Sequence, residues 1–228
     1  MRKFLPILVA GLCLAPFPVE GGDDLAKRIQ DLVSRVDARY AQTQDFQADF
    51  IQETRIEGFE TPLISSGHLY IKKPGRLRWD YVEPSVEQIY VNGDQVEMYV
   101  PEHNQILKGN LTMMVATKAP LRLLQGVGKL TEQFEVSATG NGERGDGGLL
   151  LLTLIPKGQS PAGGSPITRI VSEIQPQTYF IQTVSIHETS GNVSTFRFTN
   201  LKANTGLDDR VFDLVPPEGV VIVEDIIP

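Results

Sequence analysis

The chain has 228 residues, with 21 Lys or Arg and 28 Asp or Glu, and its formal net charge at pH 7 is −7. An acidic chain of this kind repels polyanions, which excludes nucleic acid and anionic lipid headgroups as main partners. Its length suits one large β domain with a real core, and no long linker suggests a second domain.

The first 21 residues have the pattern of a secretory signal peptide. Arg2 and Lys3 precede an apolar run from Phe4 to Phe17, and small side chains flank a cleavage position near Gly21. The run is shorter than the roughly 20 residues that span a bilayer. We therefore expect residues 1–21 to be removed.

The single cysteine, Cys13, falls within this signal. Leu12 precedes it, whereas a lipobox needs a small side chain there, so we expect Cys13 to be an ordinary apolar residue of the signal core. Residues 22–228 would then form one domain without cysteine, which excludes disulfides and thiol chemistry.

One amphipathic helix is predicted at the start of this domain. Asp23 and Asp24 occupy the positions of an N-cap and a first-turn carboxylate. Apolar side chains then recur at helical spacing, namely Leu25, Ile29, Leu32, Val33, Val36 and Tyr40.

From Phe46 onward the apolar period changes to two, which is typical of strands. We predict eleven strands, at 46–54, 63–72, 76–82, 86–91, 95–100, 104–108, 132–139, 148–155, 167–175, 179–188 and 193–201. Asn92-Gly93 and Gly191-Asn192 mark tight hairpins, so the sheet should be antiparallel.

The hairpin at residues 67–81 has two contrasting faces. Apolar Leu77, Trp79 and Tyr81 alternate with charged Arg76, Arg78 and Asp80. Pro74-Gly75 supplies the fixed and the permissive φ of a tight turn. The apolar side suits a greasy ligand better than a reaction centre.

One segment, Thr112 to Gly128, interrupts the strands. Its apolar residues include Met113, Met114, Leu121, Leu123 and Leu124. We expect it to be the second helical element.

Motifs for catalysis or cofactors are weak. Gly140-Asn141-Gly142-Glu143-Arg144-Gly145 matches a dinucleotide-binding pattern, but a strand is predicted after it, where that motif needs a helix. His68, His103 and His187 have no partners at metal-ligand spacing, and no nucleophile elbow is present. We expect no enzyme activity, metal or cofactor.

Several stretches together resemble one family. They are Asp45 to Gln52, Gly67 to Tyr81, Pro84, Val91 to Asp94, Met98-Tyr99 and Phe212 to Val220. On these residues the chain resembles the outer-membrane lipoprotein carrier protein family, LolA, over nearly all of residues 22–228.

The resemblance implies a mainly β fold: an unclosed, curved antiparallel β-barrel of eleven strands, with short α-helices forming a lid over a hydrophobic cavity. It also implies a monomeric periplasmic chaperone that carries triacylated lipoproteins toward the outer membrane. The cargo would come from the inner-membrane ABC transporter LolCDE and pass to the receptor LolB where one exists.

The resemblance also implies roles for individual residues. Phe46, Phe50, Leu77 and Trp79 would point into the cavity, and Leu121, Leu123 and Leu124 would belong to the lid helix. We expect Met98 to line the cavity too, because an adaptable thioether can repack around different chains.

Family members usually have an Arg before the hairpin proline, and this Arg bonds to backbone carbonyls of the lid. Lys73 occupies that position here. A lysine keeps the charge but loses the planar fork of arginine, so we predict a lid latch that opens more easily. Lys72 or Arg76 could take over the latch role.

Three other functions stay open at this stage. A LolA-like carrier or sensor of another lipid or glycolipid would need the same apolar surface. A periplasmic lipid hydrolase would need a nucleophile and a base that meet in the cavity. A structural module would have a fully packed interior, which the same apolar alternation would also give.

Overall fold

The structure is a computed structural model that describes residues 22–110, 129–140, 142–157 and 167–224. The predicted signal peptide and the predicted helical element at 112–128 lie outside this range. No helix in the described ranges has the length and apolar character that a membrane crossing requires.

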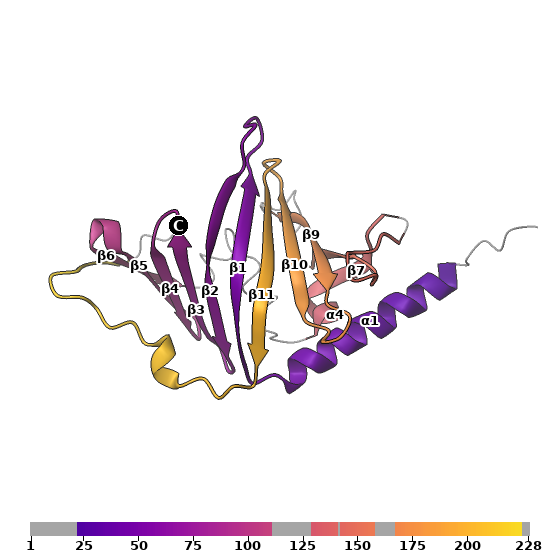
Figure 1. Cartoon of the computed structure of the whole chain (residues 1–228), viewed down its shortest axis with the longest axis horizontal. Helices are drawn as coiled ribbons and strands as arrows, with labels where there is room; N and C mark the ends of the chain where they lie inside the picture. The colour runs from indigo at the N-terminus through magenta and orange to yellow at the C-terminus, as the bar shows by residue number, and fades with distance from the viewer. Residues whose placement is uncertain (1–21, 111–128, 141, 158–166, 225–228) are drawn as a thin grey trace, which may run out of the picture.

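Most of the described chain forms one twelve-stranded sheet, shown in Figure 1. The strands are β1 (Asp45–Arg55), β2 (Leu63–Lys72), β3 (Arg76–Glu83), β4 (Glu87–Asn92), β5 (Gln95–Val100), β6 (Gln105–Asn110), β7 (Phe134–Ala138), β8 (Leu152–Pro156), β9 (Ile167–Ile174), β10 (Ile181–Glu188), β11 (Val193–Ala203) and β12 (Val221–Val223). Their order is β12-β6-β5-β4-β3-β2-β1-β11-β10-β9-β8-β7.

All eleven predicted strands are present, and the hairpins at Gly93 and Gly191 confirm the predicted turns. The largest shift is at β8, which starts at Leu152 instead of residue 148. The expectation of a purely antiparallel sheet was wrong at one edge, because β12 pairs with β6 in parallel.

The glycine pattern at residues 140–145 does not lead into a helix. Gly145 is followed by a turn and a short bridge, so a dinucleotide-binding helix is absent there.

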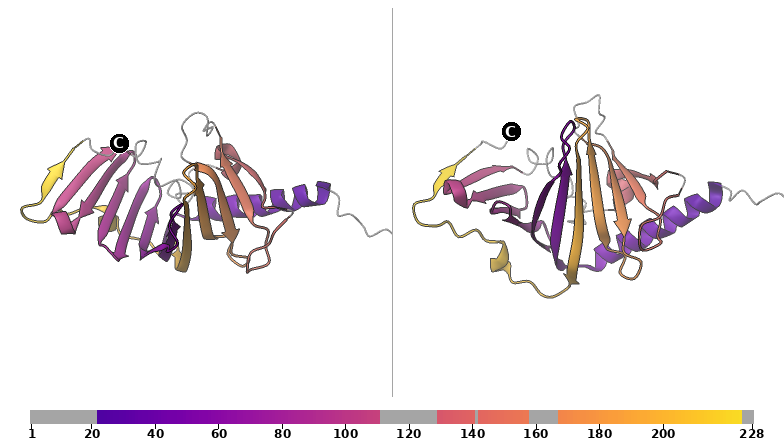
Figure 2. Two further views of the ribbon diagram at one scale, coloured as in Figure 1. Left: turned by 90° about the horizontal axis from the view of Figure 1, so that it is seen from above. Right: turned by 45° about the horizontal axis from the view of Figure 1, so that its top comes forward.

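The sheet curves but does not close. Figure 2 shows the edge strands β12 and β7 at opposite ends of the sheet, as predicted for an unclosed barrel. Helix α1 (Gly22–Gln42) runs beside the β7 to β10 end, and the one-turn helix α4 (Leu130–Gln133) packs near it. Two 3-10 turns complete the described elements, η1 (Pro101–His103) and η3 (Asp209–Phe212).

The core lies on the concave side of the sheet. Inward side chains of most strands are buried there and meet the apolar stripe of α1, formed by Leu32, Val33, Val36 and Tyr40. This stripe confirms the predicted amphipathic helix. Its burial also explains why a helix of modest intrinsic stability is held in place.

Gly67 brings β2 unusually close to its neighbours. A Cβ added there would lie 1.8 Å from the backbone oxygen of Asp80 and 2.9 Å from the ring of Phe50. The register between β2 and β3 shifts at this glycine. With no side chain on β2 at this point, inward residues of β1 and β3 can touch across it.

Residues 204–220 form a segment that we call the C-terminal strap. It leaves β11, crosses the ends of the neighbouring strands and returns to add β12 to the sheet (Figure 1). Phe212 of the strap is 3% exposed, and η3 contacts β3 and β4. The strap is therefore packed against the sheet around Phe212.

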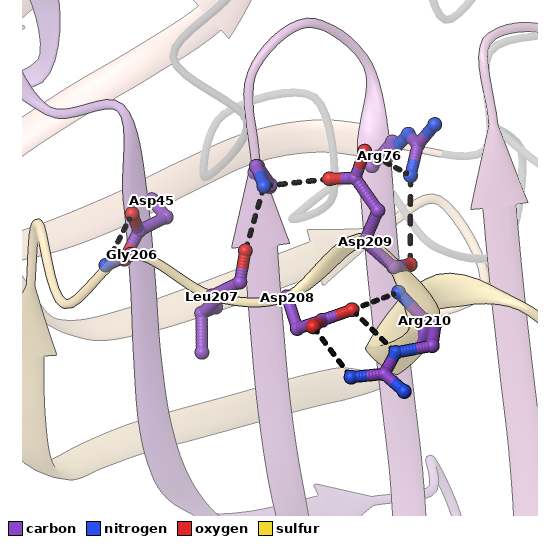
Figure 3. Close-up of polar contacts among 8 residues, drawn as sticks. Asp45, Arg76, Gly206, Leu207, Asp208, Asp209 and Arg210 are labelled. Atoms are coloured by element: carbon purple, nitrogen blue, oxygen red, sulfur yellow. Dashed lines mark hydrogen bonds and ion pairs between the residues drawn. The ribbon is translucent and has the colours of Figure 1, made fainter.

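Polar contacts fasten the strap to the sheet, as Figure 3 shows. The Asp45 carboxylate accepts hydrogen bonds from the backbone N–H groups of Thr205 (2.8 Å) and Gly206 (3.0 Å). Lys72 Nζ donates to Leu207 O and to Asp209, both at 2.6 Å. Strands β1 and β2 thus both hold the strap.

Arg78 adds a third attachment, on β3. Its guanidinium lies between the rings of Tyr70 (5.8 Å) and Tyr90 (5.2 Å) and bonds to both Asp80 oxygens at 2.9 Å. Its Nη1 donates to Val211 O of the strap at 3.3 Å. The charged face of the predicted hairpin therefore binds the chain's own C-terminal segment.

We predict that Gly67→Ala destabilises the fold by about 1–3 kcal/mol, because the methyl group would collide with backbone as well as with Phe50. Urea unfolding would measure the change. Ser65→Ala on the same strand is the control and should leave the midpoint nearly unchanged. Equal midpoints for the two variants would contradict the close approach at Gly67.

We also predict that acid loosens the strap. Burial alone raises the pKa of Asp45, but hydrogen bonds from Thr205 and Gly206 outweigh it and hold the pKa below 3.8. The hydrogen bond from Lys72 likewise lowers the pKa of Asp209. A carboxyl with a lowered folded pKa contributes stability that is present above its unfolded pKa and is lost as pH falls through the folded value.

NMR would follow the amide signals of Thr205 and Gly206 as the pH falls below about 4. They should shift with a midpoint below 3.8, and Asp45→Asn should remove that titration. A midpoint above 3.8 in the wild type would show that the hydrogen bonds do not stabilise the ionised carboxylate.

Candidate functional site: the concave apolar wall

Four of the predicted site residues meet on the concave side of the sheet. Phe46, Phe50, Leu77 and Trp79 are 4%, 1%, 0% and 2% exposed, and all belong to one apolar cluster. We call the inward apolar side chains of β1 to β5 and β11 the concave wall. The alternation read from the sequence therefore separates the buried face of these strands from the outer one.

Aromatic rings form the centre of this wall. The Phe50 ring lies 4.7 Å from that of Trp79 and 5.2 Å from that of Tyr81, centroid to centroid. Phe196 on β11 meets Trp79 edge-on at 5.4 Å. The glycine at position 67 permits these contacts across β2.

Met98 extends the wall toward the β6 edge. It is partly buried against the core and pairs with Ile89 on β4 and Leu107 on β6. Met98 therefore lies on the same face of the sheet as Trp79, and its lining of a cavity stays a prediction. The expected lid residues Leu121, Leu123 and Leu124 lie outside the described residues.

Helix α1 closes the wall at the Phe46 end. Tyr40 meets the rings of Phe46 (6.2 Å) and Phe180 (5.5 Å), and its hydroxyl accepts a hydrogen bond from Ile181 N at 3.3 Å. Burial raises the pKa of Tyr40 well above its usual value. This phenol therefore stays neutral within the apolar wall.

The helix is not packed tightly on all sides. A pocket of about 650 Å³ lies along it beside Ile29, Val33 and Val136, and another of about 500 Å³ lies beside Leu32, Leu150 and Tyr179. Two flanks of α1 are therefore bordered by open pockets.

Lys73, the predicted latch, binds a helix carbonyl. Its Nζ donates to Tyr40 O in the last turn of α1, and burial lowers the pKa of the amine. The neighbouring cations are engaged elsewhere, since Lys72 and Arg76 both contact Asp209 of the strap. Lys73 thus binds α1, whereas Lys72 and Arg76 bind the strap.

A row of polar side chains, which the sequence analysis missed, crosses the upper part of the same face. The Tyr81 hydroxyl donates to Gln52 Oε1 (2.8 Å), and Gln52 Nε2 donates to Thr54 Oγ1 (3.0 Å). Thr54 in turn lies 3.2 Å from Ser194 Oγ. We call Tyr81, Gln52, Thr54 and Ser194 the polar row.

A signal for this row was present in the sequence. Phe46, Ala48 and Phe50 establish the inward face of β1, and the same alternation continues to Gln52 and Thr54. The change from apolar to polar along one face marks where the apolar wall ends.

The histidines offer no reactive cluster. His68 lies on the outer face, where its Nδ1 meets Asp49 at 2.7 Å, and Asn200 donates to the other oxygen of that carboxylate. These contacts, that of Asn200 first, lower the pKa of Asp49. In the part of the chain that the structure describes, His, Cys, Asp and Glu form no group of three that could hold a metal ion.

Comparison with known proteins gives one family. The sequence profile "Outer membrane lipoprotein carrier protein LolA" matches residues 41–215. An outer-membrane lipoprotein carrier protein of Methylococcus capsulatus is 29% identical over 192 residues, which cover 84% of this chain and 87% of the relative. One from Nitrosomonas europaea is 25% identical over 228 residues, 99% of this chain and all of the relative.

A solved structure supports the fold. An uncharacterized conserved protein from Thermus thermophilus superposes with a TM-score of 0.56 at 14% identity, covering 86% of this chain and 98% of its own. The profile spans all of β1 to β11, and with them the concave wall, and most of the strap. This chain therefore belongs to the outer-membrane lipoprotein carrier family, LolA.

Proposed function

We propose that this protein is a periplasmic chaperone that binds the acyl chains of lipoproteins and carries them from the inner to the outer membrane. The observation that carries the proposal is the concave wall, a continuous apolar surface on a sheet that stays open at its edges. Family membership and relatives named as lipoprotein carriers support the same function.

The energetics of the cargo explain why such a wall is needed. Each methylene that leaves water contributes about 0.8 kcal/mol, so one long acyl chain in water costs on the order of 10 kcal/mol. Three chains on one lipoprotein would drive aggregation. A carrier must shelter them, and it must also release them, which requires an adaptable enclosure.

In this proposal Phe46, Phe50, Leu77, Trp79 and Met98 line the hydrophobic cavity. Leu121, Leu123 and Leu124 belong to a helical lid, and Lys73 is the latch. The contact of Lys73 with α1 and the pockets along that helix support an enclosure that opens on this side. The interior then holds hydrocarbon instead of a reaction centre, so the protein acts as a carrier and not as an enzyme.

The proposal includes the maturation and the partners. Residues 1–21 would direct export and be removed, and residues 22–228 would act as one monomeric domain. The inner-membrane ABC transporter LolCDE would load the carrier with triacylated lipoproteins. The outer-membrane receptor LolB, where present, would take them over.

Native mass spectrometry of the protein purified from its own periplasm tests the proposal. We expect a population with one bound lipoprotein. A bound free lipid or glycolipid instead would indicate a carrier or sensor of another lipid, and released acyl chains would indicate a hydrolase. A protein that is empty in every preparation, and that binds no fluorescent fatty acid, would indicate a purely structural module.

We predict that acyl chains contact Trp79, the single tryptophan of the chain. A synthetic triacylated lipopeptide with brominated chains should quench its fluorescence in a saturable way, because bromine quenches only at close range. The same lipopeptide without bromine is the control. Aqueous iodide should quench weakly, since Trp79 is 2% exposed. Equal emission with both lipopeptides would contradict acyl binding at the wall.

We predict that Lys73→Arg holds the carrier shut more firmly. A guanidinium can bond to several carbonyls at once, and each added bond contributes about 0.5–1.5 kcal/mol, which corresponds to about two- to twelvefold slower opening. Hydrogen exchange of peptides covering the end of α1 and residues 112–128 would measure this. Lys73→Met should accelerate the exchange of the same peptides. If the amide protection of these peptides is unchanged in both variants, Lys73 does not act as the latch.

A further inference from the structure

The polar row stands out because it interrupts an apolar surface. Gln52 pairs in register with Phe196, and Thr54 pairs with Ser194, so the row continues the inward face that carries Phe50. Its four members are partly exposed, whereas Phe50 and Phe196 are buried. The row therefore borders the wall at a level that a ligand can reach.

Three strands hold the row in one line. Tyr81 comes from β3, Gln52 and Thr54 from β1, and Ser194 from β11. Tyr81 reaches Gln52 across β2 because Gly67 presents no side chain there. Each member orients the next by a hydrogen bond, so the groups are positioned before any ligand arrives.

The row has more donors than its own contacts use. Gln52 Nε2 carries two N–H groups, and one of them meets Thr54. Thr54 and Ser194 share one hydrogen bond, which leaves one hydroxyl hydrogen available for another acceptor.

The chemistry of these groups selects a class of ligand atom. The row contains no charged side chain, so it offers nothing to balance a carboxylate or a phosphate. Its spare groups are neutral donors, and the matching partners are neutral acceptors. Ester and amide carbonyls, which join acyl chains to a lipid anchor, are acceptors of this kind.

We propose that the polar row is a subsite for the ester and amide carbonyls of the lipid anchor, and that it sets the orientation of the acyl chains on the concave wall. This inference rests on the proposed carrier function. The chains run from the row toward Phe46 and α1, over six residues of β1 or about 20 Å. The polypeptide of the cargo leaves past the β1–β2 hairpin.

The test compares two probes. One is a synthetic triacylated lipopeptide, and the other is its analogue with both glyceryl chains attached by ether bonds, which lack carbonyls. By calorimetry the wild type should bind the ester probe about five- to tenfold more tightly, as expected for one or two hydrogen bonds. The variants Thr54→Val and Gln52→Leu should lose this preference and keep their affinity for the ether probe.

A matched control lies on the opposite face of the sheet. Thr195 and Ser185 form a similar hydroxyl pair across β10 and β11, at 2.9 Å. Thr195→Val should keep the full preference for the ester probe. Thermal unfolding of each variant would confirm that it is folded, and Tyr81→Phe gives a further variant if Gln52→Leu is unstable.

Quenching of Trp79 tests the orientation separately. Bromine placed near the carbonyl end of the chains should quench more strongly than bromine near the methyl end, because Trp79 lies close to the row. The reverse order would overturn the orientation.

The affinity measurements separate the subsite from the carrier function. Equal affinity of the wild type for the ester and ether probes would overturn the subsite and leave the carrier function intact. Failure of the wild type to bind either probe would overturn both.

Discussion

The close approach of β2 and β3 at Gly67 is the contact on which the concave side depends. Because no Cβ occupies that position, the Phe50, Trp79 and Tyr81 rings meet across a strand that would otherwise separate them. The same gap lets Tyr81 reach Gln52. The aromatic centre of the wall and the polar row are thus two results of one missing side chain.

The sheet could be predicted because the sequence pattern of each strand lies within a short stretch of the chain. A period of two that runs through eleven segments, with turn residues between them, specifies strands and faces without any tertiary contact. The same alternation places Phe46, Phe50, Leu77 and Trp79 on the apolar faces of their strands, and these faces are buried. Helix α1 was predictable for a similar reason, since its apolar stripe alone indicates which side is buried.

The features that sequence reasoning missed all depend on partners far away in the chain. β12 is three residues long and pairs with β6, which lies more than a hundred residues earlier. The strap is held by Asp45 and Lys72, whose bonding partners near residues 205–209 carry no local pattern. The polar row could be read only in part: the alternation of β1 places Gln52 and Thr54 on the inward face, but their bonds to Tyr81 and Ser194 join three strands.

The two faces of strand β3 have different roles: the inner face belongs to the concave wall, and the outer face binds the strap. On the outer face, Arg78 is fixed by Asp80, two tyrosine rings and the strap, none of which belongs to the concave wall. The curvature of this half of the sheet is therefore supported from outside. Among the described residues, two pockets lie along the flanks of α1, at the other end of the sheet. The contacts on the convex side thus brace the frame without using any of the buried side chains of the concave wall.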